Sequence, residues 1–545
     1  MHRLHIFILF QLAVFHPLFE QLRLSPEFFL ANNNSPFDIK ALFLLFWLAL
    51  PLLLIAVVQA ISHYSQKAGV RAHLIVFALL FLIMTFFALN RTTDLTPGLM
   101  VLTALFLTAS ITAGYARYHS IRSFFTFLFP IILIPPVLFF SNSFILKLLR
   151  AENTFVKGMR VGNQVPVVMI IFDELPLSSL LKANDQIDSA RFPNFAKLVD
   201  ESHWFRNTTT VAGYTSAAVP AILTGRYPEG AKIPMFFDHP QNLFVMLGGS
   251  HRIVARETAT RLCPGSLCES RIATFRVRFG LLLSQIGILY SHLVLPSAWA
   301  DRWFPIEDVV NFCKSPEDRA ADFTQFFELV GPPSGDLPPF YFTHIQLPHS
   351  PWRYLPSGAT MNDEMLEALK QEIARQSPAR VAELFPLQCH LLQVEFVDRL
   401  LGRFLERLRR ANLYDPALII VTSDHGLTRA VNDGRITDVS NISNLDSMEN
   451  LLVPFFMKLP NQKSGVISDR NVQTIDVLPT IADALGIKVD WTDGASALDE
   501  SLPERPDRYF YKNGQKTIIN VHLSVDRKML SNKLALDEMP IALIK

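Results

Sequence analysis

The sequence predicts an α/β domain, built on a mixed, mostly parallel sheet with helices on both faces, that follows an α-helical transmembrane domain. Two observations support this prediction. Long apolar segments almost free of charge are concentrated before Arg150, and from Val161 onward apolar strand-like runs alternate with amphipathic helical patterns, as in α/β folds. We therefore expect a transmembrane domain over residues 1–146, a linker over 147–160 and a second domain over 161–545.

Four apolar segments come close to the ~20 residues that a helix needs to cross a bilayer. They are residues 41–62, 74–89, 95–115 and 123–146. A fifth segment, residues 6–19, is shorter and contains His16 and Pro17, so a span, an interfacial helix and a signal-peptide core are alternatives for it. No small-residue cleavage site follows it, which argues against its removal. The sequence thus predicts four to five spans.

Basic residues set the expected orientation. Lys67 and Arg71 lie in one loop between spans, Arg117 and Arg122 lie in another, and both loops fall on the same face of the membrane. The positive-inside rule makes that face cytoplasmic. The basic residues within 147–160 count against this orientation unless they contact anionic lipid headgroups. We expect an integral protein of the cytoplasmic membrane in which residues 161–545 are extracytoplasmic.

All four cysteines follow the predicted spans, and an even count suits an oxidising compartment. Cys263 and Cys268 could close a small loop, whereas Cys313 and Cys389 are either a second pair or free thiols. One further apolar stretch, residues 280–295, is short and contains polar residues. We expect a buried or membrane-skimming helix there and an uninterrupted second domain.

The overall charge argues against a nucleic-acid partner. The 50 basic and 49 acidic residues give a net charge of +1, and no basic stripe with interleaved aromatic residues occurs. The membrane lipid bilayer is the expected partner.

Side chains that bind metals end two of the predicted strands. An apolar run from Val167 ends in Asp173 and Glu174, and another run ends in Asp424 and His425. Buried parallel strands deliver such residues to the carboxyl edge of an open sheet. Carboxylates combined with an imidazole favour zinc or manganese. We expect one divalent metal, zinc by preference, with manganese or calcium as alternatives.

Neighbouring residues on an extended strand point to opposite faces, so Asp424 and His425 can both bind a metal only if the chain turns there. Gly426 allows such a turn. A simple loop cap is the alternative. Asp173 and Glu174 pose the same question, with an exposed loop start or a helix cap as the alternative.

The segment from Tyr214 to Ser216 carries hydroxyl groups, among them that of Thr215, that could act as a nucleophile beside a metal. A threonine hydroxyl is weak at neutral pH and needs a metal or base to activate it. The small residues that follow suit the start of a helix, where free amides and the helix dipole hold a phosphate oxyanion. Ser216 and Tyr214 are alternative nucleophiles, and Thr215 could instead merely cap the helix.

These segments resemble the alkaline phosphatase superfamily and, within it, the sulfatase-like branch. The sulfatase nucleophile lies ten residues before the Gly of a Leu-Thr-Gly-Arg signature, and counting back from Gly225 reaches Thr215. Sulfatases place a formylglycine precursor in Cys/Ser-x-Pro-x-Arg, whereas residues 215–219 lack the Pro and the Arg. The resemblance therefore shifts toward membrane-anchored phosphoethanolamine transferases and lipoteichoic acid synthases, which use a Thr nucleophile and zinc or manganese.

The resemblance implies roles for further residues. Glu174 matches the transferase metal ligand and Asp173 the extra sulfatase ligand, so the implied metal-binding set is Asp173, Glu174, Thr215, Asp424 and His425. The Pro-His-x-Pro segment implies that His349 binds substrate and protonates the leaving group. His344 is the weaker candidate, expected to pack in the sheet. Arg435 could supply positive charge to the substrate, although no spacing argument fixes it.

We expect a membrane-anchored, metal-dependent hydrolase or transferase that acts on phosphate esters through Thr215, with His349 assisting the leaving group. A lipid-linked or glycan phosphate is the expected substrate class. One alternative is a sulfuric ester hydrolase without formylglycine. Another is a catalytically silent protein that binds lipid headgroups and regulates partners.

Overall fold

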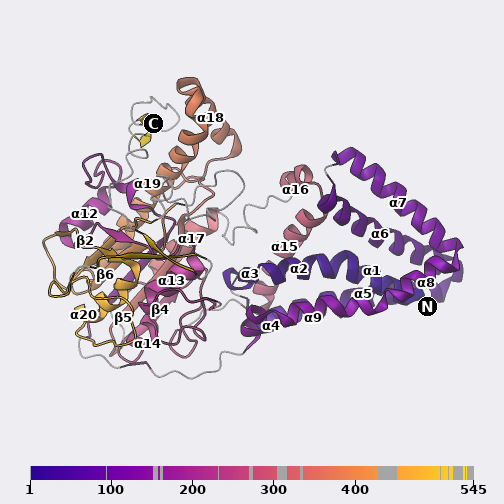
Figure 1. Ribbon diagram of the computed structural model, residues 1–545, viewed down its shortest axis with the longest axis horizontal. Helices are drawn as coiled ribbons and strands as arrows, with labels where there is room; N and C mark the ends of the chain where they lie inside the picture. The colour runs from indigo at the N-terminus through magenta and orange to yellow at the C-terminus, as the bar shows by residue number, and fades with distance from the viewer. Residues whose placement is uncertain are drawn as a thin grey trace. The chain divides into compact units, whose positions relative to one another are not determined.

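The computed structural model describes most of the chain, in two compact units that are considered separately (Figure 1). The described residues are 2–32, 34–93, 95–150, 158–159, 164–230, 232–268, 274–303, 316–331, 335–427, 451–503, 505–512, 515–519, 532–533 and 535–536. The first unit combines Met1–Ala151 with Ile272–Cys313, and the second combines Glu152–Arg271 with Lys314–Lys545. The apolar segment near residue 285 therefore groups with the first unit, whereas the sequence analysis placed it in the second domain.

The first unit is a bundle of long apolar helices. Among the described residues, six helices are long and apolar enough to cross a membrane: Arg3–Leu24, Pro36–Tyr64, Gln66–Thr92, Pro97–Arg117, His119–Ser141 and Phe275–Val294. They comprise α1 (His2–Phe10), η1 (Gln11–Phe15) and α2 (His16–Leu24); α4 (Pro36–Leu44), η2 (Leu45–Ala49) and α5 (Leu50–Tyr64); α6 (Gln66–Thr92); α7 (Pro97–Arg117); α8 (His119–Phe127), η3 (Phe129–Leu133) and α9 (Ile134–Ser141); and α15 (Phe275–Val294). The length and composition of these helices indicate a membrane protein.

The N-terminal segment lies inside this bundle. Its apolar window is 61% buried, compared with 22–28% for the other five helices. Its polar residues have partners: His5 contacts Tyr115 Oη through Nδ1 at 2.7 Å and Thr126 Oγ1 through Nε2 at 2.8 Å. His73 Nε2 contacts the same Tyr115 hydroxyl at 3.0 Å. Because these contacts satisfy polar groups between apolar helices, the segment can occupy the bundle interior.

The second unit is built on a seven-stranded sheet of order β4-β5-β1-β6-β7-β2-β8 (Figure 1). Its strands are β1 (Val167–Asp173), β2 (His203–Phe205), β4 (Arg252–Arg256), β5 (Pro339–Pro348), β6 (Leu418–Ser423), β7 (Phe455–Lys458) and β8 (Val466–Ser468). β4, β5, β1 and β6 run parallel, and β7 is antiparallel to both β6 and β2. The predicted mixed, mostly parallel sheet is confirmed.

Helices cover both faces of the sheet, which explains why the central strands are continuous apolar runs. One face packs on α12 (Pro193–Glu201), α17 (Pro316–Glu328), α18 (Asp363–Gln376) and α19 (Val381–Arg410). The other face packs on α13 (Thr215–Thr224), α14 (Leu243–Leu247) and α20 (Val477–Ala484). Val168, Ile170 and Phe172 of β1 belong to the first core, whereas Val167, Met169 and Ile171 belong to the second. This alternation is the period of two expected of a strand.

Smaller elements complete the described structure. They are α3 (Glu27–Ala31), α10 (Ser143–Leu149), α11 (Leu177–Leu180), α16 (Ser297–Trp303), η5 (Pro378–Arg380), η8 (Thr474–Asp476), β3 (Thr208–Thr209), β9 (Val472–Gln473), β10 (Arg508–Lys512) and β11 (Gln515–Ile519). Cys263 and Cys268 form the expected disulfide, and Cys389 is a buried free thiol. Cys313 lies outside the described residues.

A glycine ends the helix that carries the candidate nucleophile. Gly225 caps α13 with φ 68°, and a Cβ built on it would lie 2.7 Å from Thr492 Cγ2 and 3.3 Å from the Ile475 carbonyl oxygen. Gly486 has a similar φ of 70° but open space around its Cβ position. A substitution at Gly486 would therefore test the effect of backbone strain alone, whereas a substitution at Gly225 adds a steric contact.

We predict that Gly225→Ala destabilises the second unit more than Gly486→Ala. Both substitutions strain a left-handed residue, by about 1–2 kcal/mol, but only Gly225→Ala also displaces Thr492. Thermal unfolding of the detergent-solubilised chain should show the larger loss of Tm for Gly225→Ala. Equal losses would contradict the tight contact at Gly225.

Candidate active site

The ends of β1 and β6 bring two carboxylates together. The strands pair in parallel up to Phe172 and Ser423, so Asp173 and Asp424 follow at neighbouring positions on the carboxyl edge of the sheet. Both side chains are buried. The backbone N–H of Asp424 donates to the Phe172 carbonyl oxygen at 3.0 Å, which continues the pairing beyond the strand. The strand register therefore fixes the separation of the two acids.

The alternation of side chains adds a histidine to this pair. β5 lies on the other side of β1, with His344 opposite Ile171. Phe340 and Phe342 of β5 face the same core as Ile171, and His344 is the next residue in that period-two series. His344 consequently reaches the face of the sheet that carries α13, the helix that begins with Thr215.

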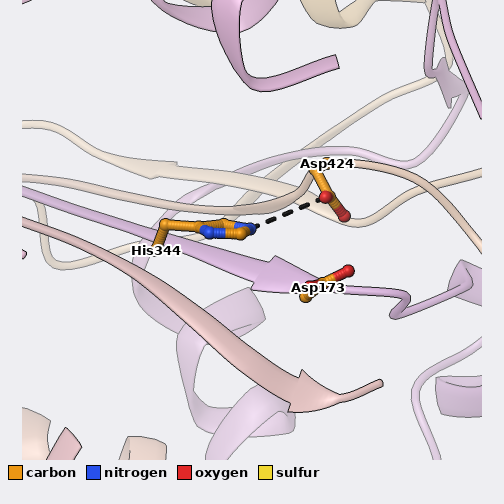
Figure 2. Close-up of side chains that lie close together, drawn as sticks. All are labelled: Asp173, His344 and Asp424. Carbon is orange, nitrogen blue, oxygen red and sulfur yellow. Dashed lines mark ion pairs between the residues drawn. The ribbon is translucent and has the colours of Figure 1, made fainter. Parts of the chain in front are cut away.

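Asp173, His344 and Asp424 form a compact, fully buried cluster (Figure 2). One ligand atom from each residue lies within 4.8 Å of the others, and His344 Nε2 is 3.6 Å from Asp424 Oδ2. Nitrogen and carboxylate oxygen atoms at these separations suit a divalent metal. The cluster is thus a candidate metal site.

Thr215 and His425 lie next to this cluster. Thr215 Oγ1 is 3.4 Å from Asp173 Oδ1 and 3.5 Å from His425 Nε2. His425 Nε2 is also 3.8 Å from Asp173 Oδ1 and 3.5 Å from Asp424 Oδ2. His425 Nδ1 donates to the Gly426 carbonyl oxygen at 2.9 Å, which leaves Nε2 as the acceptor of the neutral ring. His425 is therefore oriented as a ligand.

The turn after β6 is held by hydrogen bonds. Asp424 Oδ1 accepts from the backbone N–H groups of Glu174, at 3.2 Å, and of His425, at 2.7 Å. Thr210 Oγ1 donates to the Asp424 carbonyl oxygen at 2.7 Å. Because the chain turns here, adjacent residues can face the same centre, as the sequence analysis required of Asp424 and His425.

Two buried atoms of the site have unmet bonding capacity. Within the described part of the chain, neither Asp424 Oδ2 nor His344 Nε2 has a hydrogen-bond partner, although they face each other. Burying such polar atoms without a partner costs about 1–3 kcal/mol each. A bound cation would satisfy the carboxylate oxygen, and the observed donor set fits zinc or manganese.

The charges of the site are unbalanced in the absence of a cation. Burial, followed by repulsion from the Asp424 carboxylate, raises the pKa of Asp173. Burial opposes ionisation of Asp424 too, but the His425 and His344 rings outweigh it and hold the pKa of Asp424 at about 2. Burial lowers the pKa of His425, but attraction to Asp424 and Asp173 exceeds that effect and raises it. The two carboxylates thus compete for positive charge.

Glu174 and His349 form a separate pair at the same edge. Glu174 has φ 59°, and its Oε1 lies 3.7 Å from His349 Nε2. The described contacts join Asp173 to Thr215 and His425, whereas they join Glu174 to His349. The resemblance matched Glu174 to the transferase ligand and Asp173 to the extra sulfatase ligand, and these contacts place the Asp173 side chain, rather than that of Glu174, beside Thr215 and His425.

The backbone of His349 is firmly held. Its carbonyl oxygen accepts from Arg319 Nη1 at 2.7 Å and from Gln393 Nε2 at 3.0 Å. Its Nδ1 donates to the Ser350 carbonyl oxygen at 2.6 Å, so Nε2 is directed to Glu174. Arg435 lies outside the described residues.

The main residue that the sequence analysis undervalued is His344. It was expected to pack in the sheet, but it joins the acidic cluster and also contacts Thr258 Oγ1 through Nδ1, at 2.5 Å. The period-two series with Phe340 and Phe342 was a signal that could have identified its face. The register that brings it beside Asp424 was not available from the sequence.

Comparisons with known proteins agree with this architecture. The family model described as Sulfatase matches residues 301–487, which include His344, His349, Asp424 and His425 but not Asp173 or Thr215. The expected resemblance to sulfatases is confirmed by this match. An endo-4-O-sulfatase of Bacteroides thetaiotaomicron is 24% identical over 193 residues, 34% of this chain and 34% of that protein. The match thus spans about a third of the curated relative's length.

Solved structures similar to the chain include two phosphonate monoester hydrolases. The enzyme from Silicibacter pomeroyi has 19% identity and a TM-score of 0.41, covering 64% of this chain and 79% of that chain. The enzyme from Agrobacterium radiobacter has 18% identity and a TM-score of 0.41, covering 64% and 80%.

We predict that the purified chain holds near-equimolar zinc or manganese. Asp424→Asn should remove most of this metal, because Asp424 Oδ2 is buried and has no hydrogen-bond partner among the described residues. Elemental analysis after gel filtration measures this. Asp469→Asn is the matched control, since Asp469 pairs with Arg206 at the surface of the same unit. Equal metal content in both variants would contradict the assignment.

We also predict that metal affinity falls as pH falls. The raised pKa values of Asp173 and His425 mean that both groups hold protons more tightly than ordinary Asp and His, so a metal must displace those protons. Binding should release protons, measured by calorimetry in buffers of different ionisation enthalpy. Asp173→Asn should reduce the proton release, and an affinity independent of pH would contradict this electrostatic account.

Proposed function

We propose that the chain is a membrane-anchored, metal-dependent enzyme of the sulfatase type that acts on phosphate esters through Thr215. The observation that carries the proposal is the position of Thr215 Oγ1, within 3.5 Å of both Asp173 Oδ1 and His425 Nε2 at the start of α13. A hydroxyl beside a candidate metal site and at a helix N-terminus has the surroundings that a nucleophile for phosphoryl transfer needs.

Each residue of the site has its own role in a two-step phosphoryl transfer. A divalent metal held by Asp173, Asp424 and the imidazoles of His344 and His425 would supply Lewis-acid stabilisation to the attacking oxygen. Asp173 accepts a hydrogen bond from Thr215 Oγ1 and orients it. As the Thr215 oxygen forms a bond to phosphorus, its proton passes to Asp173 and the bond to the leaving oxygen breaks.

The second half of the reaction regenerates Thr215. His349, oriented by Ser350 and Glu174, protonates the leaving oxygen in the first step. Water or an acceptor hydroxyl then attacks the phosphothreonine and gives its proton to His349. The bond from phosphorus to the Thr215 oxygen breaks, and Asp173 returns the proton to that oxygen. Water makes the enzyme a hydrolase, and an acceptor hydroxyl makes it a transferase.

The apolar helices support a location at a membrane. Basic residues in the loops near Lys67 and Arg117 favour the cytoplasm for that face of the bundle and an extracytoplasmic second unit. A site held near a bilayer suits a lipid-linked or glycan phosphate. Zinc is the preferred metal because two carboxylates and two imidazoles surround the centre.

Sulfate ester hydrolysis without formylglycine is the second candidate. It is favoured by the family match over residues 301–487 and by the similarity to an endo-4-O-sulfatase. It is disfavoured by residues 215–219, which lack the Pro and Arg of the formylglycine motif. A silent lipid-binding role is disfavoured by the convergence of Asp173, Thr215 and His425 on one centre.

We predict that Thr215→Ala lowers kcat on aryl phosphodiesters by about 10³-fold or more, because the attacking oxygen is removed. Ser216→Ala is the matched control, since Ser216 is the adjacent hydroxyl on the same helix, and it should retain activity. The assay compares nitrophenyl phosphodiester, monoester and sulfate substrates.

The same assay separates the candidate functions. Faster turnover of the sulfate ester would favour the sulfatase alternative. Retained activity in Thr215→Ala, with loss in Ser216→Ala, would move the nucleophile to Ser216. Peptide mass spectrometry of acid-quenched wild type should locate the phosphoryl adduct on Thr215.

A further inference from the structure

We propose that α15 is a membrane-embedded helix that does not cross the bilayer, and that its exposed apolar face contacts lipid acyl chains. α15 is one of the six helices that are long and apolar enough to span. It belongs to the first unit although the chain on both sides of it belongs to the second. α15 is therefore part of an insertion within the sequence of the second unit.

The sheet rules out a single crossing. β4 precedes α15 and β5 follows it, and the two strands pair in parallel from Arg252 opposite Pro339 to Arg256 opposite Thr343. Adjacent strands of one sheet lie on one side of a membrane. If α15 crossed, the chain would have to cross again before Pro339.

The sequence after α15 contains no such return. Between residues 295 and 338 no uncharged run exceeds seven residues, because acidic and basic residues recur throughout. A return helix needs ~20 predominantly apolar residues. α15 therefore enters and leaves on the same side, and five of the six candidate helices remain as spans.

A bidentate ion pair fixes the start of α15 to α4. Arg278 Nε donates to Asp38 Oδ2 at 2.9 Å, and Arg278 Nη2 donates to Asp38 Oδ1 at 3.2 Å. The Asp38 side chain is 0% exposed and that of Arg278 15%. Asp38 Oδ2 also accepts from the backbone N–H of Ser35 at the N-cap of α4. A planar guanidinium matched to a buried carboxylate gives a directional attachment.

Two hydrogen bonds fix the rest of the helix to other parts of the bundle. Tyr290 Oη donates to the Ala13 carbonyl oxygen at 2.7 Å, and Asn90 Nδ2 donates to the Leu295 carbonyl oxygen at 3.0 Å. The segment is thus attached near its start to α4 and near its end to η1 and α6. Since apolar helices in lipid gain little from the hydrophobic effect, packing and polar contacts of this kind determine their association.

Within the described part of the chain, the opposite face of α15 is exposed and mainly apolar, although Arg276 and Ser284 of the helix are exposed too. Phe275, Val277 and Leu281 are 42%, 52% and 61% exposed, whereas Leu282 and Ile286 are buried against the bundle. This exposed face continues the surface of a bundle in which four other long helices are also mostly unburied, whereas Arg3–Leu24 is mostly buried. Lipid acyl chains are therefore the occupant that the surroundings of this face favour.

The proposal is tested by lipid cross-linking in the full chain. A photoreactive benzoylphenylalanine is placed at Leu281 and, as controls, at the buried Leu282 and at the exposed Val466 of β8. The chain is reconstituted in vesicles of phosphatidylethanolamine and phosphatidylglycerol. We expect lipid adducts at Leu281 at least tenfold above those at Val466. Absence of lipid adducts at Leu281, or adducts to a second copy of the chain, would overturn the lipid contact.

The non-crossing topology has its own test. Cysteines at Gly230 and Gly331, where a Cβ meets open space, flank α15 in the chain. A membrane-impermeant maleimide should label both from the same side of intact vesicles, above the background of the parent chain. Labelling of one only after permeabilisation would overturn the topology. Neither experiment uses activity, so failure here is distinguishable from failure of the proposed function.

Discussion

The parallel pairing of β1 with β5 and β6 is the constraint on which the rest of the site depends. It carries Asp173, His344 and Asp424 to one buried edge and leaves two carboxylates competing for positive charge. Such an arrangement costs stability unless a cation occupies it. Helices pack on both faces of the sheet, and α13 delivers the Thr215 hydroxyl to this edge.

Much of this site follows from local sequence pattern. Apolar runs that end in Asp173 and Asp424 predict two buried parallel strands, and the small residues after Thr215 predict the start of a helix, as observed. The turn that lets both Asp424 and His425 face the centre was anticipated from Gly426. These features depend on residues close together in the chain.

Other features depend on long-range register and could not be derived from sequence. The contact of Asp173, rather than Glu174, with Thr215 accompanies a left-handed backbone at Glu174, which local sequence pattern does not reveal. The position of His344 depends on which strand lies beside β1. The grouping of α15 with the first unit depends on contacts more than two hundred residues apart, such as Arg278 with Asp38.

The central claim is the proposal that one metal is bound by Asp173 and Asp424 together with the imidazoles of His344 and His425, next to Thr215. Anomalous diffraction at the zinc and manganese edges, from crystals of the full chain grown with the metal, tests it most directly. The account predicts one peak within bonding distance of those carboxylates and imidazoles, and adjacent to Thr215 Oγ1. No peak at saturating metal, or a peak only at another site, would contradict the account.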